Sequence, residues 1–273
     1  MTRTMTQTTR LVRSSDGTEI AYEVSGTGPA LVLVDGAMCQ RALGPARALA
    51  ALLADTFTVY AYDRRGRGES GPGVAPWDAA RELEDLAAVL EVAGGRPHLF
   101  GSSSGGALAL EAARLGLPVG RLVVYEAPFI VDGTHAPNDL DLPEQVRGLV
   151  DEGRRGEAVR TFLRVVGMPA AMVPLMRFMP PWKQMTAIAH TLPYDLAMVV
   201  PHQQGKPLPE GCYDAVEAET LVIAGGKSPE YMRNAQAAIA AAVPHARLET
   251  LPGQTHMIKA GAVAPVVRSF LTR

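Results

Sequence analysis

A serine flanked by glycines forms the clearest chemical motif of the sequence. The segment Gly101-Ser102-Ser103-Ser104-Gly105-Gly106 follows a short apolar run and precedes a run rich in alanine and leucine. Only one reading frame fits Gly-x-Ser-x-Gly, and it places Ser103 at the centre. A sharp strand-to-helix turn of this kind exposes the central hydroxyl, and the glycines let neighbouring backbone approach it. The motif predicts a nucleophilic serine; a glycine-rich turn without chemistry is the alternative.

A serine hydroxyl needs a general base to take its proton, and histidine is the usual one. The chain has six histidines, at positions 98, 135, 190, 202, 245 and 256. Of these, His256 alone follows the last predicted strand, at the sheet edge where Ser103 should emerge. We therefore expect His256 to be the base, and the others to be packed, surface or pocket-polar residues.

Three separate segments resemble the α/β-hydrolase superfamily along nearly the whole chain. They are the Gly-x-Ser-x-Gly turn, the run Tyr62-Asp63-Arg64-Arg65-Gly66-Arg67-Gly68-Glu69-Ser70, and Pro252-Gly253-Gln254-Thr255-His256. The resemblance implies an α/β fold with a mostly parallel eight-stranded sheet and a helical cap inserted after strand 6. We expect the charges of the run from Asp63 to Ser70 to tie a turn and to have no catalytic part.

The acidic residue that would complete a catalytic triad with Ser103 and His256 departs from the superfamily's common pattern. That pattern places it after the seventh strand, where this chain has Ala224-Gly225-Gly226-Lys227-Ser228-Pro229 and no carboxylate. Glu230 is close but lies on the first turn of a helix, where the helix dipole explains an acid. Glu126 directly follows the strand next to the nucleophile strand, and there it could orient the His256 ring. We favour Glu126; pairing with an arginine is the alternative.

The segment around Glu126 also looks similar to zearalenone-type lactonases. Tyr125-Glu126-Ala127-Pro128 together with the serine turn carries this likeness, and those enzymes use the acid after strand 6. Asp35-Gly36 after the third strand resembles them as well.

The loop after the third strand is expected to hold the oxyanion. The N–H of Gly36 or Ala37, paired with that of Ser104, could bind a tetrahedral oxyanion; we take Gly36 and Ser104 as the expected pair. Asp35 and Ala37 are then expected to contact substrate. The Asp35 carboxylate would repel a developing negative charge, so it should turn away and hydrogen-bond to backbone or to a substrate hydroxyl.

Short β-branched runs alternate with longer helical ones, which is typical of a parallel sheet with crossover helices. The predicted strands are Glu19–Ser25, Ala30–Val34, Thr58–Tyr62, Pro97–Phe100, Arg121–Tyr125, Thr220–Ala224 and Arg247–Leu251. The predicted helices are Arg41–Ala54, Trp77–Ala93, Ser104–Leu115, Glu230–Ala242 and Ala262–Leu271.

The alternation stops between positions 132 and 212, a span holding 10 of the 21 prolines and 6 of the 11 methionines. We expect residues 132–212 to form a helical cap, and residues 1–131 and 213–273 to form the α/β-hydrolase core. Short cap helices are predicted at Leu142–Gly153, Glu157–Gly167 and Met179–Thr191. Met168, Met172, Met176, Phe178, Met179 and Met185 are mostly cap core in this interpretation, and Trp182 is the cap residue expected to contact substrate.

Composition excludes several classes of partner. The chain has 273 residues, 47% of them hydrophobic, and a net charge of −2, which gives no footprint for nucleic acid or for an anionic membrane. The segment Met1 to Arg10 lacks the apolar stretch of a secretory signal, and Cys39 and Cys212 cannot form a disulfide framework or a zinc site. We expect a cytoplasmic protein, monomeric or homodimeric, with no metal and no cofactor, because no dinucleotide or phosphate loop is present.

These residues together predict a serine hydrolase with a Ser103–His256–Glu126 triad, acting on a carboxylic ester or lactone of an apolar small molecule through an acyl-enzyme. Two alternatives stay open. One is other carbonyl chemistry on the same fold, as in a C–C hydrolase, a thioesterase or a cyclase. The other is a non-catalytic small-molecule binder, since a fold does not dictate its function.

Overall fold

One eight-stranded sheet organises the molecule. The computed structural model describes residues 8–73 and 78–273. The strand order is β1-β2-β4-β3-β5-β6-β7-β8. The pairs β1–β2 and β2–β4 are antiparallel, and all the other neighbouring pairs are parallel. The strands are β1 (Arg10–Arg13), β2 (Glu19–Ser25), β3 (Ala30–Val34), β4 (Thr58–Tyr62), β5 (His98–Ser102), β6 (Arg121–Tyr125), β7 (Glu219–Gly225) and β8 (Ala246–Leu251). The mostly parallel eight-stranded sheet is confirmed.

Four strands have the bounds predicted from the sequence: β2, β3, β4 and β6. β1 was not expected, because it is four residues long, lies at the sheet edge and has three exposed side chains. A strand of that kind buries no apolar face and therefore leaves no hydrophobic pattern in the sequence.

Helices cover both faces of the sheet. They are α1 (Ala46–Leu53) and α9 (Ala260–Leu271) on one face, and α2 (Ala80–Ala93), α3 (Ser104–Arg114) and α8 (Glu230–Ala242) on the other. α1 begins five residues later than predicted, after Gly44-Pro45, because proline fits the start of a helix but not its interior. α2 begins at Ala80; Trp77, where the sequence predicted its start, and residues 1–7 lie outside the described residues.

Strand residues alternate between two hydrophobic cores. Leu31 and Leu33 of β3 pack with α1 and α9, whereas Val32 and Val34 pack with α2 and α3. All four are at most 1% exposed. Burial on both faces explains why these strands are apolar at nearly every position.

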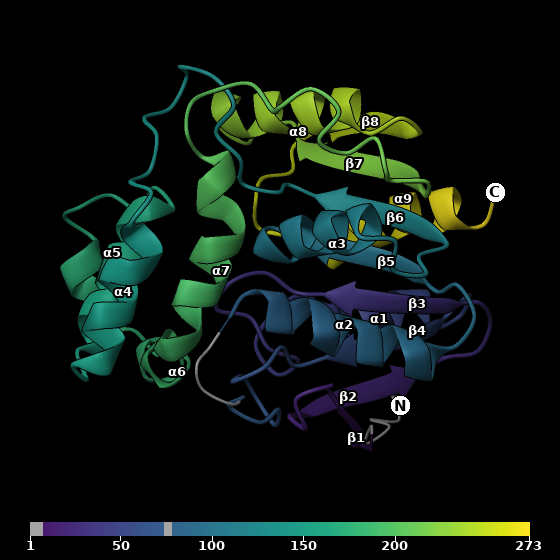
Figure 1. The fold of residues 1–273 in the computed structure, drawn as a ribbon, viewed down its shortest axis with the longest axis horizontal. Coiled ribbons are helices and arrows are strands. Elements are labelled where there is room, and N and C mark those ends of the chain that lie inside the picture. Colours follow the sequence, from purple (N-terminus) through teal and green to yellow (C-terminus); the bar gives the residue numbers. More distant parts are fainter. Residues whose placement is uncertain (1–7, 74–77) are drawn as a thin grey trace.

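The helical region between β6 and β7 lies beside the carboxyl ends of the parallel strands (Figure 1). It contains α4 (Leu142–Asp151), α5 (Arg155–Val165), η1 (Val173–Phe178), α6 (Trp182–Ala187), η2 (Ala189–Thr191), α7 (Leu192–Val199) and η3 (Val200–His202). All of them fall within the interval predicted for the cap, whose bounds at 132 and 212 stay a prediction. α7 was not predicted; its sequence LPYDLAMV is apolar on most sides and is buried over most of its length.

Candidate active site

Ser103 stands in the turn between β5 and α3. Its backbone is in a positive-φ conformation, φ 54° and ψ −128°, and its N–H donates to the carbonyl of Tyr125 at 2.9 Å. A Cβ on Gly101 would lie 2.4 Å from the Gly105 carbonyl oxygen, and one on Gly105 would lie 2.4 Å from the Val34 carbonyl oxygen. Both distances are too short for any side chain, so the strained turn requires glycine on each side of the serine.

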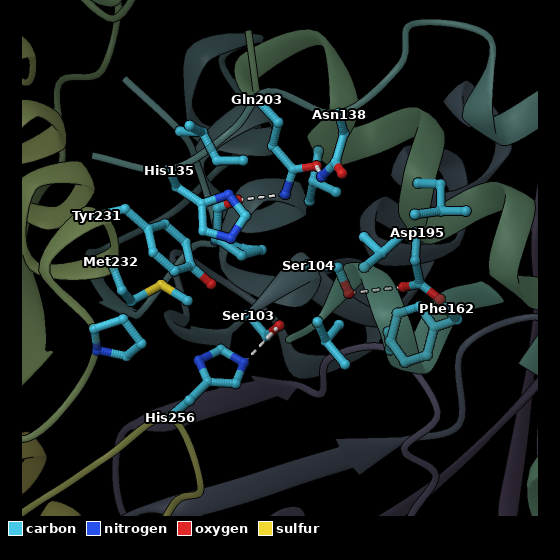
Figure 2. Close-up of a pocket in the computed structure, with 18 residues that line it drawn as sticks. Ser103, Ser104, His135, Asn138, Phe162, Asp195, Gln203, Tyr231, Met232 and His256 are labelled. Atoms are coloured by element: carbon cyan, nitrogen blue, oxygen red, sulfur yellow. Dashed lines mark hydrogen bonds between the residues drawn. The ribbon is translucent and has the colours of Figure 1, made fainter. Parts of the chain in front are cut away.

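His256 lies in the loop after β8 and faces Ser103 (Figure 2). Its Nε2 is 3.2 Å from Ser103 Oγ, and its Nδ1 is 3.1 Å from Glu126 Oε2. An ionised carboxylate only accepts hydrogen bonds, so Nδ1 must carry the ring proton and Nε2 is left free to accept the proton of Ser103.

Glu126 directly follows β6 and is fully buried. Its second oxygen, Oε1, accepts a hydrogen bond from the N–H of Gly225 at 2.6 Å. The end of β7, where the superfamily's common pattern has its acid, thus supplies a backbone donor that holds Glu126. Glu230, the alternative acid, is exposed at the start of α8.

Strained backbone gathers at this place. Among the described residues other than glycine, three have a positive φ: Met38 at 61°, Ser103 at 54° and Glu126 at 47°. Residues other than glycine and asparagine rarely adopt this conformation, which costs on the order of 1–3 kcal/mol each. The three strained residues come from segments far apart in the sequence, and they lie where the serine, the acid and the loop after β3 come together.

The loop after β3 makes a tight turn against the serine. The N–H of Cys39 donates to the Gly36 carbonyl at 3.3 Å, and the positive φ of Met38 is that of a type II turn. A Cβ on Gly36 would lie 2.8 Å from Ser103 Cβ, so only glycine permits this approach. Ala37 and Ser104 line the cavity in front of Ser103.

Comparison with known proteins identifies the family of this chain. The model of the alpha/beta hydrolase family matches residues 36–264. The chain belongs to the alpha/beta hydrolase family. An alpha/beta hydrolase from Sphaerobacter thermophilus DSM 20745 is 44% identical with a TM-score of 0.87, over 96% of this chain and 100% of that one.

Two further relatives are more distant. A hydrolase from Pseudomonas aeruginosa PA01 is 24% identical with a TM-score of 0.71, over 98% of this chain and all of that chain, and shares the fold. The Bacillus subtilis (strain 168) hydrolase YraK is 27% identical over 155 residues, which is 55% of this chain and 55% of YraK. The match therefore spans about half the length of that relative.

The cavity in front of Ser103 has a volume of about 130 Å³. One wall comes mainly from α5 and α7 and is apolar apart from Asp195; its apolar residues are Phe162, Val165, Val166, Leu196 and Val199. The opposite wall carries polar groups: His135, Asn138, Gln203 and Tyr231. Neither lysine nor arginine is among the described residues that line the cavity, so the pocket offers a substrate no positive partner.

The polar wall comes from loop residues and from the start of α8; of its members, only His135 was considered in the sequence analysis. The rings of His135 and Tyr231 are in contact, with centroids 4.4 Å apart, and the Tyr231 hydroxyl points toward Ser103 (Figure 2). Burial raises the pKa of Tyr231, so its hydroxyl stays a neutral donor. Asn138 Nδ2 donates to Gln203 Oε1 at 2.8 Å, across 65 positions of sequence. One feature of the sequence could have indicated Tyr231 as a site residue, namely its position at the start of the helix that follows β7.

Three expected substrate or oxyanion residues lie elsewhere. Trp182, on α6, is half-buried beside Gly156 and Arg160 and does not line the cavity. Asp35 is 4% exposed, packs near Gly44 and is not among the described residues that line the cavity. Burial raises its pKa to about 7.

Gly36 was expected to supply one of the oxyanion donors. It packs against the side of Ser103, and its neighbour Ala37 lines the cavity instead. The methionines of the cap do not line the cavity either, since Met232 of α8 is the methionine among its described lining residues; Met172 and Met179 are more than half exposed.

Metal and membrane features are lacking over residues 8–73 and 78–273. In that part of the chain no three His, Cys, Asp or Glu side chains gather where they could hold a metal ion. No helix there is both long and apolar enough to cross a bilayer. Cys39 and Cys212 are free thiols.

Proposed function

We propose that this protein is a serine hydrolase that cleaves a carboxylic ester or lactone of a neutral, apolar small molecule. The observation that carries the proposal is the unbroken hydrogen-bonded chain from Ser103 Oγ through His256 to the buried Glu126. Each member comes from the carboxyl end of a different strand, so the rigid sheet fixes their relative positions.

The first half of the reaction forms an acyl-enzyme. Ser103 Oγ attacks the ester carbonyl carbon while its proton passes to His256 Nε2, and the carbonyl electrons move onto the oxygen. As the tetrahedral intermediate collapses, the C–O bond to the alcohol breaks and His256 returns the proton to the leaving oxygen. Glu126 stays ionised and stabilises the imidazolium that forms between these steps.

Water completes the second half. His256 takes a proton from a water molecule, whose oxygen attacks the acyl carbon. Collapse breaks the bond to Ser103 Oγ, which regains the proton, and releases the carboxylic acid. In both halves the N–H groups of Ala37 and Ser104 are the donors facing the developing oxyanion, and Ser104 adds the positive end of the α3 dipole.

The cavity supports a neutral substrate. Its described walls are apolar on the α5 and α7 side, apart from Asp195, whose carboxylate is paired with Arg64 and Arg67, and they hold polar donors and acceptors on the other side, which fits an ester or lactone with one polar substituent. A lactone is included beside an ester because Tyr125-Glu126-Ala127-Pro128 and Asp35-Gly36 resemble zearalenone-type lactonases.

A fluorophosphonate probe tests the proposal directly. We expect the probe to label Ser103, as read by mass spectrometry of the peptide, and Ser103→Ala to abolish labelling and lower kcat on p-nitrophenyl butyrate at least 10⁴-fold. Ser102→Ala is the matched control, because Ser102 is the neighbouring buried serine at the end of β5. Failure of the native protein to label would overturn the proposal and leave a non-catalytic binder.

The rival carbonyl reactions are separated by substrate. Turnover is compared between an aryl ester, a macrocyclic lactone with its open-chain ester, an acyl thioester and a vinylogous C–C bond substrate. The proposal requires the highest kcat/KM for an ester or the lactone; a C–C or thioester substrate turned over a hundredfold faster would replace it.

A further inference from the structure

We propose that Arg67 and Asp195 are positioning residues that hold the two oxyanion donors in place, so that the cap helix α7 completes the catalytic centre. The inference rests on the proposed function and assigns this part of the site to residues outside the triad. Arg67 comes from the loop after β4, and Asp195 comes from α7, 128 positions later in the sequence.

The first donor is oriented through its own peptide group. Arg67 Nη1 donates to the carbonyl of Gly36 at 2.8 Å and to that of Cys39 at 3.3 Å. In a trans peptide the C=O and the N–H point in opposite directions. Because the Gly36 carbonyl is bound to Arg67, the N–H of the same peptide, that of Ala37, is directed away from Arg67 and toward the cavity. A cation on the carbonyl also polarises the peptide and strengthens its N–H as a donor.

The second donor is fixed through its side chain. Ser104 Oγ donates to Asp195 Oδ1 at 2.7 Å (Figure 2) and accepts from Arg64 Nη1 at 3.2 Å. The same Nη1 also donates to the Asp35 carbonyl at 3.2 Å. Arg64 thereby links the first residue of α3 to the loop after β3, and the two oxyanion donors share one support.

Asp195 holds both arginines. Its Oδ1 accepts from Arg64 Nη1 at 2.8 Å and its Oδ2 accepts from Arg67 Nη2 at 2.6 Å. Burial opposes ionisation of Asp195, but the guanidinium groups of Arg67 and Arg64 outweigh it and lower its pKa. All three side chains are at most 2% exposed, so removing the carboxylate would leave two buried cations short of a partner.

A second buried pair in the same loop provides the matched control. Arg65 makes two hydrogen bonds to Asp85 of α2, at 2.6 and 2.7 Å, and both residues are at most 1% exposed. Its further partners are Asp16 and the Arg81 carbonyl, all remote from the loop after β3. Asp85→Asn therefore breaks an equally buried arginine–carboxylate pair without contacting either oxyanion donor.

The experiment compares Asp195→Asn, Arg67→Lys and Asp85→Asn with the native enzyme, each at a temperature where circular dichroism shows it folded. Asparagine presents an amide donor to an arginine donor, and lysine cannot reach Gly36, Cys39 and Asp195 at once. We expect kcat on p-nitrophenyl butyrate to fall about 100-fold in Asp195→Asn and about tenfold in Arg67→Lys, with KM within threefold, since one oxyanion donor accounts for about 10²–10³ in kcat.

A tetrahedral analogue separates positioning from general loosening. Phenylboronic acid forms an adduct with a catalytic serine whose oxygen occupies the oxyanion site. We expect its inhibition constant to rise by the same factor as kcat falls in the two variants, and to stay within threefold of native in Asp85→Asn. Native-like kcat and boronate affinity in whichever of Asp195→Asn and Arg67→Lys folds would overturn the inference. So would equal losses in Asp85→Asn.

The two proposals fail in different ways. A native enzyme that neither labels with fluorophosphonate nor hydrolyses esters contradicts the proposed function itself. A native enzyme that does both, with variants that keep kcat and boronate affinity, contradicts only the role of Arg67 and Asp195.

Discussion

Glu126 is held at two points, and each carboxylate oxygen has one partner. Oε2 faces His256 Nδ1 and Oε1 accepts from the Gly225 N–H, which leaves the carboxylate no freedom to rotate within its buried site. An acid fixed in this way at the end of β6 can orient the imidazole as well as one placed after β7. The position of the acid along the chain is therefore free, while its position relative to the ring is not.

Replacing Glu126 with its amide isolates this orienting role. In Glu126→Gln the amide oxygen can still accept from Gly225, and the amide nitrogen is then turned toward His256 Nδ1, where it favours the wrong ring tautomer. We expect kcat on p-nitrophenyl butyrate to fall about 10³–10⁴-fold with KM nearly unchanged. Glu230→Gln is the control, since Glu230 is exposed on α8; a larger loss there would identify Glu230 as the acid.

At the scale of the element, α5 contributes to the apolar side of the cavity. Phe162, Val165 and Val166 form much of the apolar wall opposite Tyr231, and α5 packs on α6 and η1 within the cap. A wall carried by a cap helix can change shape without moving the serine or the histidine, which sit on the sheet.

Truncating that wall should shift acyl-chain preference. Phe162→Ala enlarges the cavity, so we expect the ratio of kcat/KM for a p-nitrophenyl octanoate to that for the acetate to rise about tenfold, in line with 1–3 kcal/mol for apolar pocket contacts. The exposed Phe178, 72% accessible on η1 and not a cavity residue, provides the control in Phe178→Ala. An unchanged ratio in Phe162→Ala would mean that the acyl group lies elsewhere.

The glycines of the nucleophile turn differ from Gly148 of the helix α4. A Cβ on Gly105 would lie 2.4 Å from the Val34 carbonyl oxygen and 2.6 Å from that of Asp35, whereas a Cβ on Gly148, exposed inside α4, meets nothing within 4 Å. We expect Gly105→Ala to lower the free energy of unfolding by more than about 2 kcal/mol. Gly148→Ala should raise it by about 0.5–1 kcal/mol. Urea denaturation of both variants measures these changes in the free energy of unfolding. Equal changes in the two variants would contradict the predicted contrast.

At the scale of the whole molecule, the α7 helix is joined to the core by buried charge. Asp195 contacts Arg64 and Arg67 from the loop after β4, and Thr191 Oγ1 accepts from Arg67 Nε at 3.2 Å. These contacts close the site from the cap side. Asp35, another buried acid of this region, is less fully paired, because its Oδ2 has no hydrogen-bond partner among the described residues.

Asp35 makes folding stability depend on pH. Burial raises its pKa to about 7, above its ordinary 3.8, despite the opposing charges of Arg67 and Arg64. Because the folded state binds this proton more tightly than the unfolded state, the contribution is fully present below pH 4 and is lost as pH rises through 7. Asp35→Asn keeps an uncharged group there, so we expect it to be more stable than native at pH 8 by on the order of 2–4 kcal/mol.

Thermal unfolding between pH 5 and 8.5 measures this effect. The melting temperature of Asp35→Asn should fall less across the range than that of the native protein. Parallel curves for the two proteins would show that Asp35 is ionised in the folded state throughout.

The sequence predicted those features that depend on local pattern. Ser103, His256 and Glu126 each follow a predicted strand, and strands of a parallel sheet end at one edge, so their proximity could be inferred. Trp182 could not be placed, because which face of a short cap helix meets the site depends on packing between helices. Asp195 gave no signal for the same reason: its partner Arg64 lies 131 positions away, and only the folded cap brings them together.

The three residues with a positive φ, Met38, Ser103 and Glu126, make thermal stability and catalytic activity compete in this protein. At Ser103 and Glu126 a glycine would relieve the positive φ at no steric cost, so selection for heat resistance alone would favour changes that also remove the serine or the acid. Met38→Gly would relieve the positive φ as well, but it would delete a side chain that is 8% exposed in the hydrophobic core and would loosen the turn that presents the Ala37 N–H. Libraries made from this scaffold should therefore be screened for catalysis and stability together, since these positions exchange one for the other.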